Sequence, residues 1–126
     1  MHRRFEGAPT SELSCPGGTV RAVVARGFRL RLVGLMRLSG AEMVPLLFPR
    51  CRSIHTHAMK APIDLVWLSV ERECARVLGV VESLGPGRHQ RCRPNGVARR
   101  SVAALELSPG EAQRLGLRAG SAVGIA

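Results

Sequence analysis

Apolar residues alternate with polar ones, or run together, in segments that predict short strands. Valine-rich alternation from residue 18 to 25 predicts a first strand. The segment 63–70 is the most apolar in the chain, so we expect a central strand there. A turn at 71–73 and the apolar segment 75–84 fit a second strand that closes a hairpin with it, although a helix over 75–84 also fits.

Two further segments are predicted to be short helices, the first of them amphipathic. Phe28, Leu32 and Leu35 recur at i, i+4 and i+7 with arginines between them, which predicts an apolar stripe facing a core. The second helix is predicted to begin at Ser108, with a proline in its first position and a glutamate three residues after the cap, and to end at Gly116.

The rest of the chain completes a β-rich pattern. Strands are predicted within 43–49, 53–59 and 97–107 and after residue 116, and the glycines and prolines of 84–96 predict a loop. This order predicts an α+β domain: a small, mostly antiparallel or barrel-like sheet with two short helices. We expect residues 1–18 to be a flexible N-terminal tail and residues 19–126 to be a single domain.

The composition indicates an intracellular protein. No stretch approaches the eighteen apolar residues of a membrane-spanning helix, and the basic N-terminus has no apolar region typical of an export signal. The four cysteines are widely spaced, which favours free thiols over disulfides or a zinc knuckle. The sequence therefore predicts a cytoplasmic protein that is monomeric or weakly associating and makes no contact with a membrane.

The net charge of +10 favours binding to anionic partners, among which nucleic acid is a candidate. Arginine accounts for all but one of the 19 basic residues, and no block of arginines is longer than two. The same usage follows from a GC-rich coding bias, and the few aromatic residues are not interleaved with the charges as a base-stacking surface requires. The sequence therefore predicts that any binding to nucleic acid is non-specific.

Three segments together resemble the domain-of-unknown-function 192 family. They are RLRLVGLM at 29–36, CRSIHTHAMKAPIDLVWLS at 51–69 and ALELSPGEAQRLGLRAGS at 104–121, in the family's order and spacing. The resemblance implies a small β-rich α+β domain of unknown activity. The chain departs from the family pattern at His57, where an aromatic residue is usual, at Ala58 and Ala61, and at Ser121, where the family has an aspartate.

The segment 51–69 concentrates the rarer polar residues of the chain. Cys51, His55, His57 and Met59 share one side of any straight strand, a set that suits copper(I), or zinc without the thioether. The structural alternative is a bend at 52–53, a histidine bonded to a backbone carbonyl and a methionine that fills a core. We predict no metal site, because ligands from one strand give poor tetrahedral geometry. If a metal did bind, the weak candidate ligands would be Cys51, His55 and His57.

Lys60 and Asp64 flank Pro62 and are the only lysine and the only aspartate of the chain. A lysine beside a carboxylate can transfer protons or bind an anion, whereas an aspartate at a proline turn more often accepts backbone amide bonds. We interpret the segment as a binding site for a small molecule or an anionic partner. Its predicted residues are His55, Thr56, Met59, Lys60 and Asp64, with Lys60 contacting the anion and Asp64 organising the turn.

Catalysis is the second hypothesis. A metal-assisted hydrolase would use His55, His57 and Asp64. A thiolate mechanism is disfavoured because positions 51 and 55 of a straight strand lie roughly 13 Å apart, too far for a cysteine–histidine hydrogen bond. The basic, glycine-containing loop 84–96 lacks a phosphate-binding motif, and no cofactor is predicted.

Overall fold

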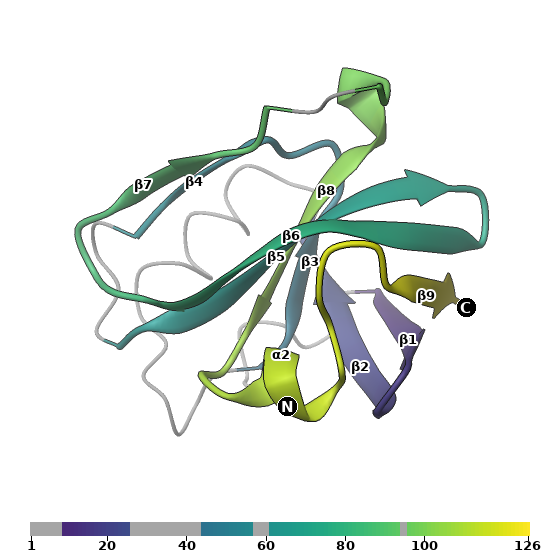
Figure 1. Cartoon of the computed structure of the whole chain (residues 1–126), viewed down its shortest axis with the longest axis horizontal. Coiled ribbons are helices and arrows are strands. Elements are labelled where there is room, and N and C mark those ends of the chain that lie inside the picture. The colour runs from purple at the N-terminus through teal and green to yellow at the C-terminus, as the bar shows by residue number, and fades with distance from the viewer. Residues whose placement is uncertain (1–8, 26–43, 57–60, 94–95) are drawn as a thin grey trace.

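The structure, a computed structural model, describes residues 9–25, 44–56, 61–93 and 96–126. Seven strands close a barrel in the order β1-β2-β3-β8-β5-β6-β9, and β4 and β7 pair in a separate ribbon beside it (Figure 1). The strands are β1 (Thr10–Cys15), β2 (Gly18–Val24), β3 (Leu46–Phe48), β4 (Ser53–His55), β5 (Ile63–Glu71), β6 (Cys74–Leu84), β7 (His89–Arg91), β8 (Val102–Leu107) and β9 (Ala122–Ile125). All neighbouring pairs are antiparallel except β2 and β3.

The predicted α+β class with two short helices is wrong, because the described part of the chain is mostly strand and closes into a barrel. Its helical elements are the four-residue α2 (Glu111–Arg114) and the 3-10 turn η2 (Arg99–Ser101). Gly110, with a φ of 91°, precedes α2 in place of the predicted cap Ser108. The helix predicted around Phe28, Leu32 and Leu35 lies outside the described residues.

Alternating side chains divide the apolar residues into two cores. The inner core fills the barrel and consists of Leu13, Ala22, Val24, Leu47, Val66, Leu68, Ala75, Val77, Ala103, Leu105, Leu107, Ala112, Leu115, Leu117 and Val123. The outer core lies between the barrel and the β4–β7 ribbon and consists of Val23, Ala25, Leu46, Phe48, Cys51, Ile54, Ile63, Leu65, Trp67, Leu84, Cys92, Val102 and Ala104. Strands β2, β3, β5 and β8 contribute to both, because neighbouring residues of a strand face opposite sides. The central sheet is therefore buried on both faces.

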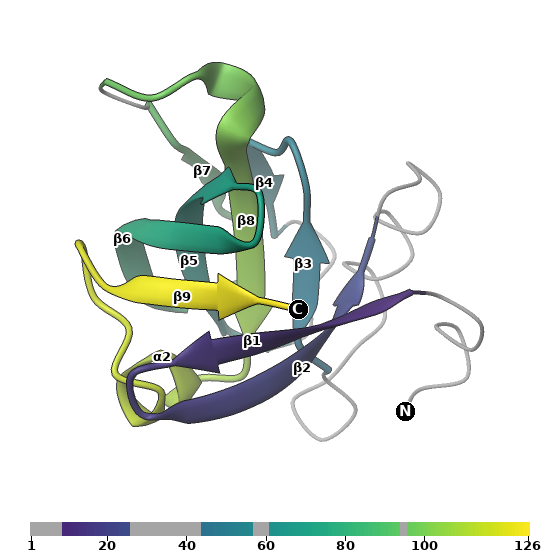
Figure 2. The same ribbon diagram turned by 90° about the vertical axis from the view of Figure 1, so that its right-hand side faces the viewer.

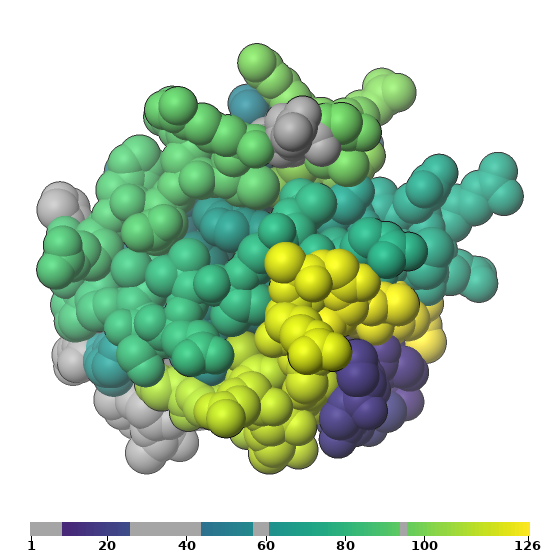
Figure 3. All heavy atoms as spheres, in the orientation of Figure 1, coloured from purple at the N-terminus to yellow at the C-terminus, as the bar shows by residue number. Residues whose placement is uncertain are grey.

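The helix α2 closes one end of the barrel. Ala112 and Leu115 belong to the inner core, and the Gly17 amide donates a 2.9 Å hydrogen bond to the Leu115 carbonyl. A Cβ at Gly17 would lie 2.4 Å from the Arg114 carbonyl oxygen, so only glycine allows this approach. Figure 2 shows α2 at the lower end of the barrel and η2 at the upper end, and Figure 3 shows α2 and β1 side by side below β9.

Two strands lie where the sequence predicts other structure. β1 falls within the segment 1–18 that was expected to be a tail, and β7 lies within the predicted loop 84–96. β1 carries one fully buried apolar side chain, Leu13, and β7 carries none, so neither has the apolar pattern that indicates a strand. The strands predicted at 18–25, 63–70 and 75–84 are confirmed as β2, β5 and β6.

Thiol reactivity tests the placement of the four cysteines, all of which are free. Cys74 is exposed, whereas Cys51 and Cys92 are buried in the outer core, where burial raises the pKa of the Cys92 thiol. We expect a thiol reagent to modify Cys74 rapidly in the native protein and to modify Cys51 and Cys92 only after unfolding, because the thiolate is the reactive form. Mass spectrometry after partial labelling measures this order. Equal labelling of Cys92 and Cys74 would contradict the outer core.

Candidate functional site

The residues of the predicted metal set that the structure describes do not converge. Cys51 is buried in the outer core and donates its thiol to the Ser53 carbonyl at 3.3 Å, whereas the His55 side chain is exposed. His57 and Met59 lie outside the described residues. No group of three potential metal ligands occurs within 9–25, 44–56, 61–93 and 96–126. The described side chains therefore give no support to metal binding at this strand.

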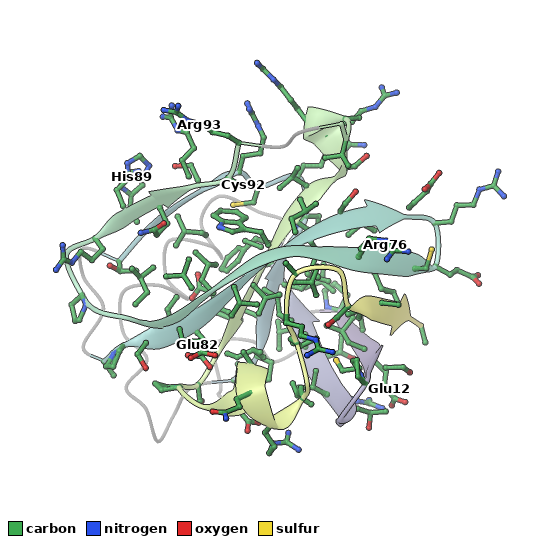
Figure 4. All side chains as sticks on the ribbon, in the orientation of Figure 1. Glu12, Arg76, Glu82, His89, Cys92 and Arg93 are labelled. Atoms are coloured by element: carbon green, nitrogen blue, oxygen red, sulfur yellow. The ribbon has the colours of Figure 1, made fainter. Side chains whose placement is uncertain are left out.

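His55 stacks on a histidine that lies far from it in the sequence. The His55 and His89 rings are 4.1 Å apart and nearly parallel across the β4–β7 ribbon, and Ser53 Oγ lies 2.6 Å from His89 Nε2. Desolvation, followed by the charges of His55 and Arg91, lowers the pKa of His89. Figure 4 shows His89 and Arg93 pointing outward from this ribbon, while Cys92 points toward the barrel. The pair therefore lies on an outer surface and away from the covered sheet.

Thr56 is fully buried, and its hydroxyl is hydrogen-bonded to main-chain groups. Its Oγ1 donates to the Gly85 carbonyl at 2.7 Å and accepts from the Arg88 amide at 2.7 Å. Its own amide and carbonyl bond to Arg88 and Gly87. Thr56 therefore fastens β4 to the turn before β7.

Asp64 is the main organising residue at the closed end of the barrel. It is 1% exposed and lies on the inner side of β5, where its Oδ1 accepts a 2.9 Å bond from the Ser83 amide. Its Oδ2 accepts from the amides of Gly110 at 2.9 Å and Ala112 at 3.1 Å, so it supplies the capping that the start of α2 requires. The predicted acceptor role is present, but the donors lie far along the chain and outside the turn at Pro62.

The remaining predicted site residues, Met59 and Lys60, lie outside the described part of the chain, and their roles stay predictions. Among the described members of the set, His55 is exposed, whereas Thr56 and Asp64 are buried and hydrogen-bonded to main-chain groups. The structure therefore does not bring His55, Thr56 and Asp64 together in one cleft. Ser121 does cap its turn, since Oγ accepts from the Arg118 amide at 3.1 Å.

A carboxyl that the sequence analysis did not single out lies on the covered face of the sheet. Glu106 is 0% exposed, and neither of its oxygens has a hydrogen-bond partner among the described residues. It pairs in register with Leu46 of β3 and Leu65 of β5, both outer-core residues. Because Ala104, two residues earlier on β8, also belongs to the outer core, the Glu106 side chain faces that core.

Burial determines the protonation state of Glu106. Desolvation raises the pKa of its carboxyl to about 8, so the group is mainly a neutral carboxylic acid at neutral pH. In that form it can donate one hydrogen bond and accept others. An unpaired polar group inside an apolar core is unfavourable, so each such group requires an explanation. The detectable signal in the sequence was an acidic residue inside the otherwise apolar strand VAALEL.

Part of the segment 51–69 packs on this same face. Cys51, Ile54, Ile63, Leu65 and Trp67 belong to the outer core, toward which the Glu106 side chain points. Glu106 therefore shares a core with described residues on either side of residues 57–60.

Sequence comparison identifies the family. The model of the domain-of-unknown-function 192 family (DUF192), described as "Uncharacterized ACR", matches residues 12–125, nearly the whole chain. The chain belongs to the DUF192 family. The match begins within β1, so the DUF192 domain includes part of the segment that was expected to be a tail. A comparison with curated proteins gives no match.

Two crystal structures share the fold. One is a protein of unknown function from Novosphingobium aromaticivorans, with 22% identity over 90% of this chain and 82% of that one and a TM-score of 0.60. The other, from Sinorhizobium meliloti, is provisionally named a transcription regulator and has 18% identity over 92% of each chain and a TM-score of 0.62. At these identities the likeness concerns the fold alone. Within the described residues of this DUF192 chain, no helix has the length and apolarity needed to cross a membrane.

Proposed function

We propose that this DUF192 domain is a small-molecule-binding module whose ligand hydrogen-bonds to the Glu106 carboxyl at the outer face of the sheet. The observation that supports the proposal is the complete burial of this carboxyl without a hydrogen-bond partner in the described structure. A bound polar group would satisfy it, as ligands and ordered water do for other buried polar atoms. The proposal retains a site next to the 55–64 segment but replaces Thr56 and Asp64 as its polar contacts.

The surroundings of Glu106 define the class of ligand. Leu46 and Leu65 are its cross-strand neighbours and Ala104 lies two residues earlier on β8, so a ligand that reaches the carboxyl would meet mainly apolar side chains. A carboxylic acid in such a setting suits an uncharged molecule with one hydrogen-bonding group on an apolar body. Met59 and Lys60 remain proposed as further contacts. For an uncharged ligand, the Lys60 ammonium would donate a hydrogen bond in place of the anion contact that the sequence predicted.

The other hypotheses have less support from the described residues. A hydrolase using His55, His57 and Asp64 requires a free aspartate. Both Asp64 oxygens, however, already accept hydrogen bonds from backbone amides on the side of β5 that faces the inner core. Non-specific nucleic-acid binding rests on the charge of +10. Any such affinity should fall steeply with salt and show no sequence preference. A cytoplasmic location and a monomeric or weakly associating state also remain predictions.

Ligand-observed NMR with a library of apolar fragments carrying one hydroxyl, amide or ketone tests the proposal. We expect the wild type to bind members of this library and Glu106→Leu to bind them at least about tenfold more weakly, because the polar anchor is lost. Glu82→Leu is the matched control, since Glu82 is an exposed glutamate at a strand position of β6. Equal binding by wild type and Glu106→Leu, with both variants folded, would overturn the proposal.

A further inference from the structure

A cavity of about 310 Å³ opens at the end of the barrel away from α2. Its lining residues lie at or near the ends of β2, β3, β5 and β9 and near the starts of β1 and β8, which meet at one end of the sheet. Its apolar lining consists of inner-core residues and residues packed against them: Val24, Leu47, Val70, Ala103 and Ile125. The inner core is therefore covered by α2 at one end (Figure 2) and accessible at the other.

Three arginines line the same opening. Arg50 follows β3, Arg72 lies in the turn between β5 and β6, and Arg100 lies in η2. None of the three forms an ion pair with a described residue: the ion pairs there are Arg21–Glu12 and Arg114–Glu111. Guanidinium groups from three separate turns around one cavity attract anions.

The backbone at this rim has an uncommon conformation. Arg50 has a φ of 50° and Arg72 a φ of 56°, and Ser83 is the third non-glycine residue with a positive φ in the described structure. Side chains other than glycine, asparagine and aspartate rarely adopt this region, and such strained residues concentrate at functional sites. Arg72 lies in the two-residue turn between Glu71 and Cys74, where hairpin turns require a positive φ, so Arg50 is the rim arginine whose conformation the local turn does not explain.

We infer that this opening, the arginine mouth, binds a small carboxylate with an apolar body. The guanidinium geometry matches a carboxylate, and the apolar lining matches a hydrocarbon chain inserted toward the inner core. The cavity is open to solvent on one side, and its volume of about 310 Å³ is in the range of small-molecule pockets, so a medium-chain acid is a suitable ligand. This inference does not depend on Glu106, which faces the outer core.

Titration with octanoate, followed by amide NMR, tests the inference. We expect a dissociation constant of about 1 mM or lower, with the largest shifts at Val24, Leu47 and Ile125. A triple variant, Arg50→Gln, Arg72→Gln and Arg100→Gln, should weaken binding at least about tenfold. Octan-1-ol, which lacks the carboxylate, should also bind the wild type at least about tenfold more weakly than octanoate does.

The control variant carries Arg52→Gln, Arg91→Gln and Arg93→Gln, three exposed arginines around the β4–β7 ribbon. It loses the same charge as the mouth variant and should bind octanoate within about twofold of the wild type. Equal weakening in both triple variants would assign the effect to net charge and overturn the inference. Equal affinity for octanoate and octan-1-ol, or no shifts at the mouth, would overturn it as well.

Discussion

Replacing Asp64 with alanine should lower the free energy of unfolding by about 3 to 5 kcal/mol, because three backbone amides, of which that of Ala112 is buried, lose their acceptor at once. These amides belong to β6 and to the start of α2, so the closed end of the barrel should loosen before the rest. Chemical denaturation measures the loss. Hydrogen exchange should accelerate most at Ser83, Gly110 and Ala112.

Two further variants show whether the effect belongs to these contacts. Asp64→Asn keeps the volume and one oxygen, so it should lose less stability than Asp64→Ala does. Glu71→Ala removes an exposed carboxyl from the end of the same strand and should change the stability by less than about 0.5 kcal/mol. If Asp64→Ala unfolds like the wild type but no longer binds ligand, Asp64 is a functional residue, as the alternative hydrolase hypothesis proposed.

Glu106→Gln should make the protein more stable than the wild type at alkaline pH and leave the two similar at acidic pH. The pKa of the Glu106 carboxyl is about 8 in the folded chain, against an ordinary value of 4.5. The folded state therefore retains a proton that the unfolded state releases, and the stability from this group is lost as the pH rises from about 4.5 to about 8. Each pKa unit corresponds to about 1.4 kcal/mol, so a shift from 4.5 to about 8 predicts a difference of about 5 kcal/mol at pH 8.5.

Denaturation of both proteins at pH 5, 7 and 8.5 measures this difference, and comparison with Glu82→Gln removes the contribution of other titrating groups. Glu82 is exposed, so its variant should follow the wild type at every pH. A constant difference between Glu106→Gln and the wild type across this range would mean that the pKa of the carboxyl does not change on folding, so that Glu106 is solvated or already paired.

The local sequence predicted much of the strand content but not the closure of the barrel. β5 and β6 are adjacent in sequence and strongly apolar, so their hairpin could be predicted. Closure depends on pairs between distant strands, such as β1 with β9, and on the parallel pair of β2 and β3. Periodicity carries no information about such partners. The second helix, α2, is shorter than predicted because it begins only after Gly110, whose backbone is left-handed. Asp64 accepts hydrogen bonds from the amides of Gly110 and Ala112 at its start.

The candidate site shows the same limit. The composition of 51–69 correctly drew attention to Asp64 as a hydrogen-bond acceptor, but its donors are 19 to 48 residues away in sequence. Glu106 was not singled out because a glutamate in a strand most often faces solvent. Only the pairing of β8 between β3 and β5, together with the outer core, makes its position fully buried.

The two faces of the sheet have different chemical characters. On the inner side, Asp64 is fully bonded and α2 covers one end, whereas the arginine mouth leaves the other end accessible. On the outer side, a neutral carboxyl is enclosed by apolar residues. Because Glu106 and the mouth lie on different sides of β8, variants at one should leave binding at the other unchanged.

The most direct test is an NMR titration of the Glu106 side-chain carboxyl carbon in the wild-type protein. We predict a midpoint near the pKa of about 8, and a further rise when an uncharged ligand hydrogen-bonds to the protonated group. A midpoint near the ordinary value of 4.5 would contradict the account, since it would show an ionised Glu106 that is solvated or already paired.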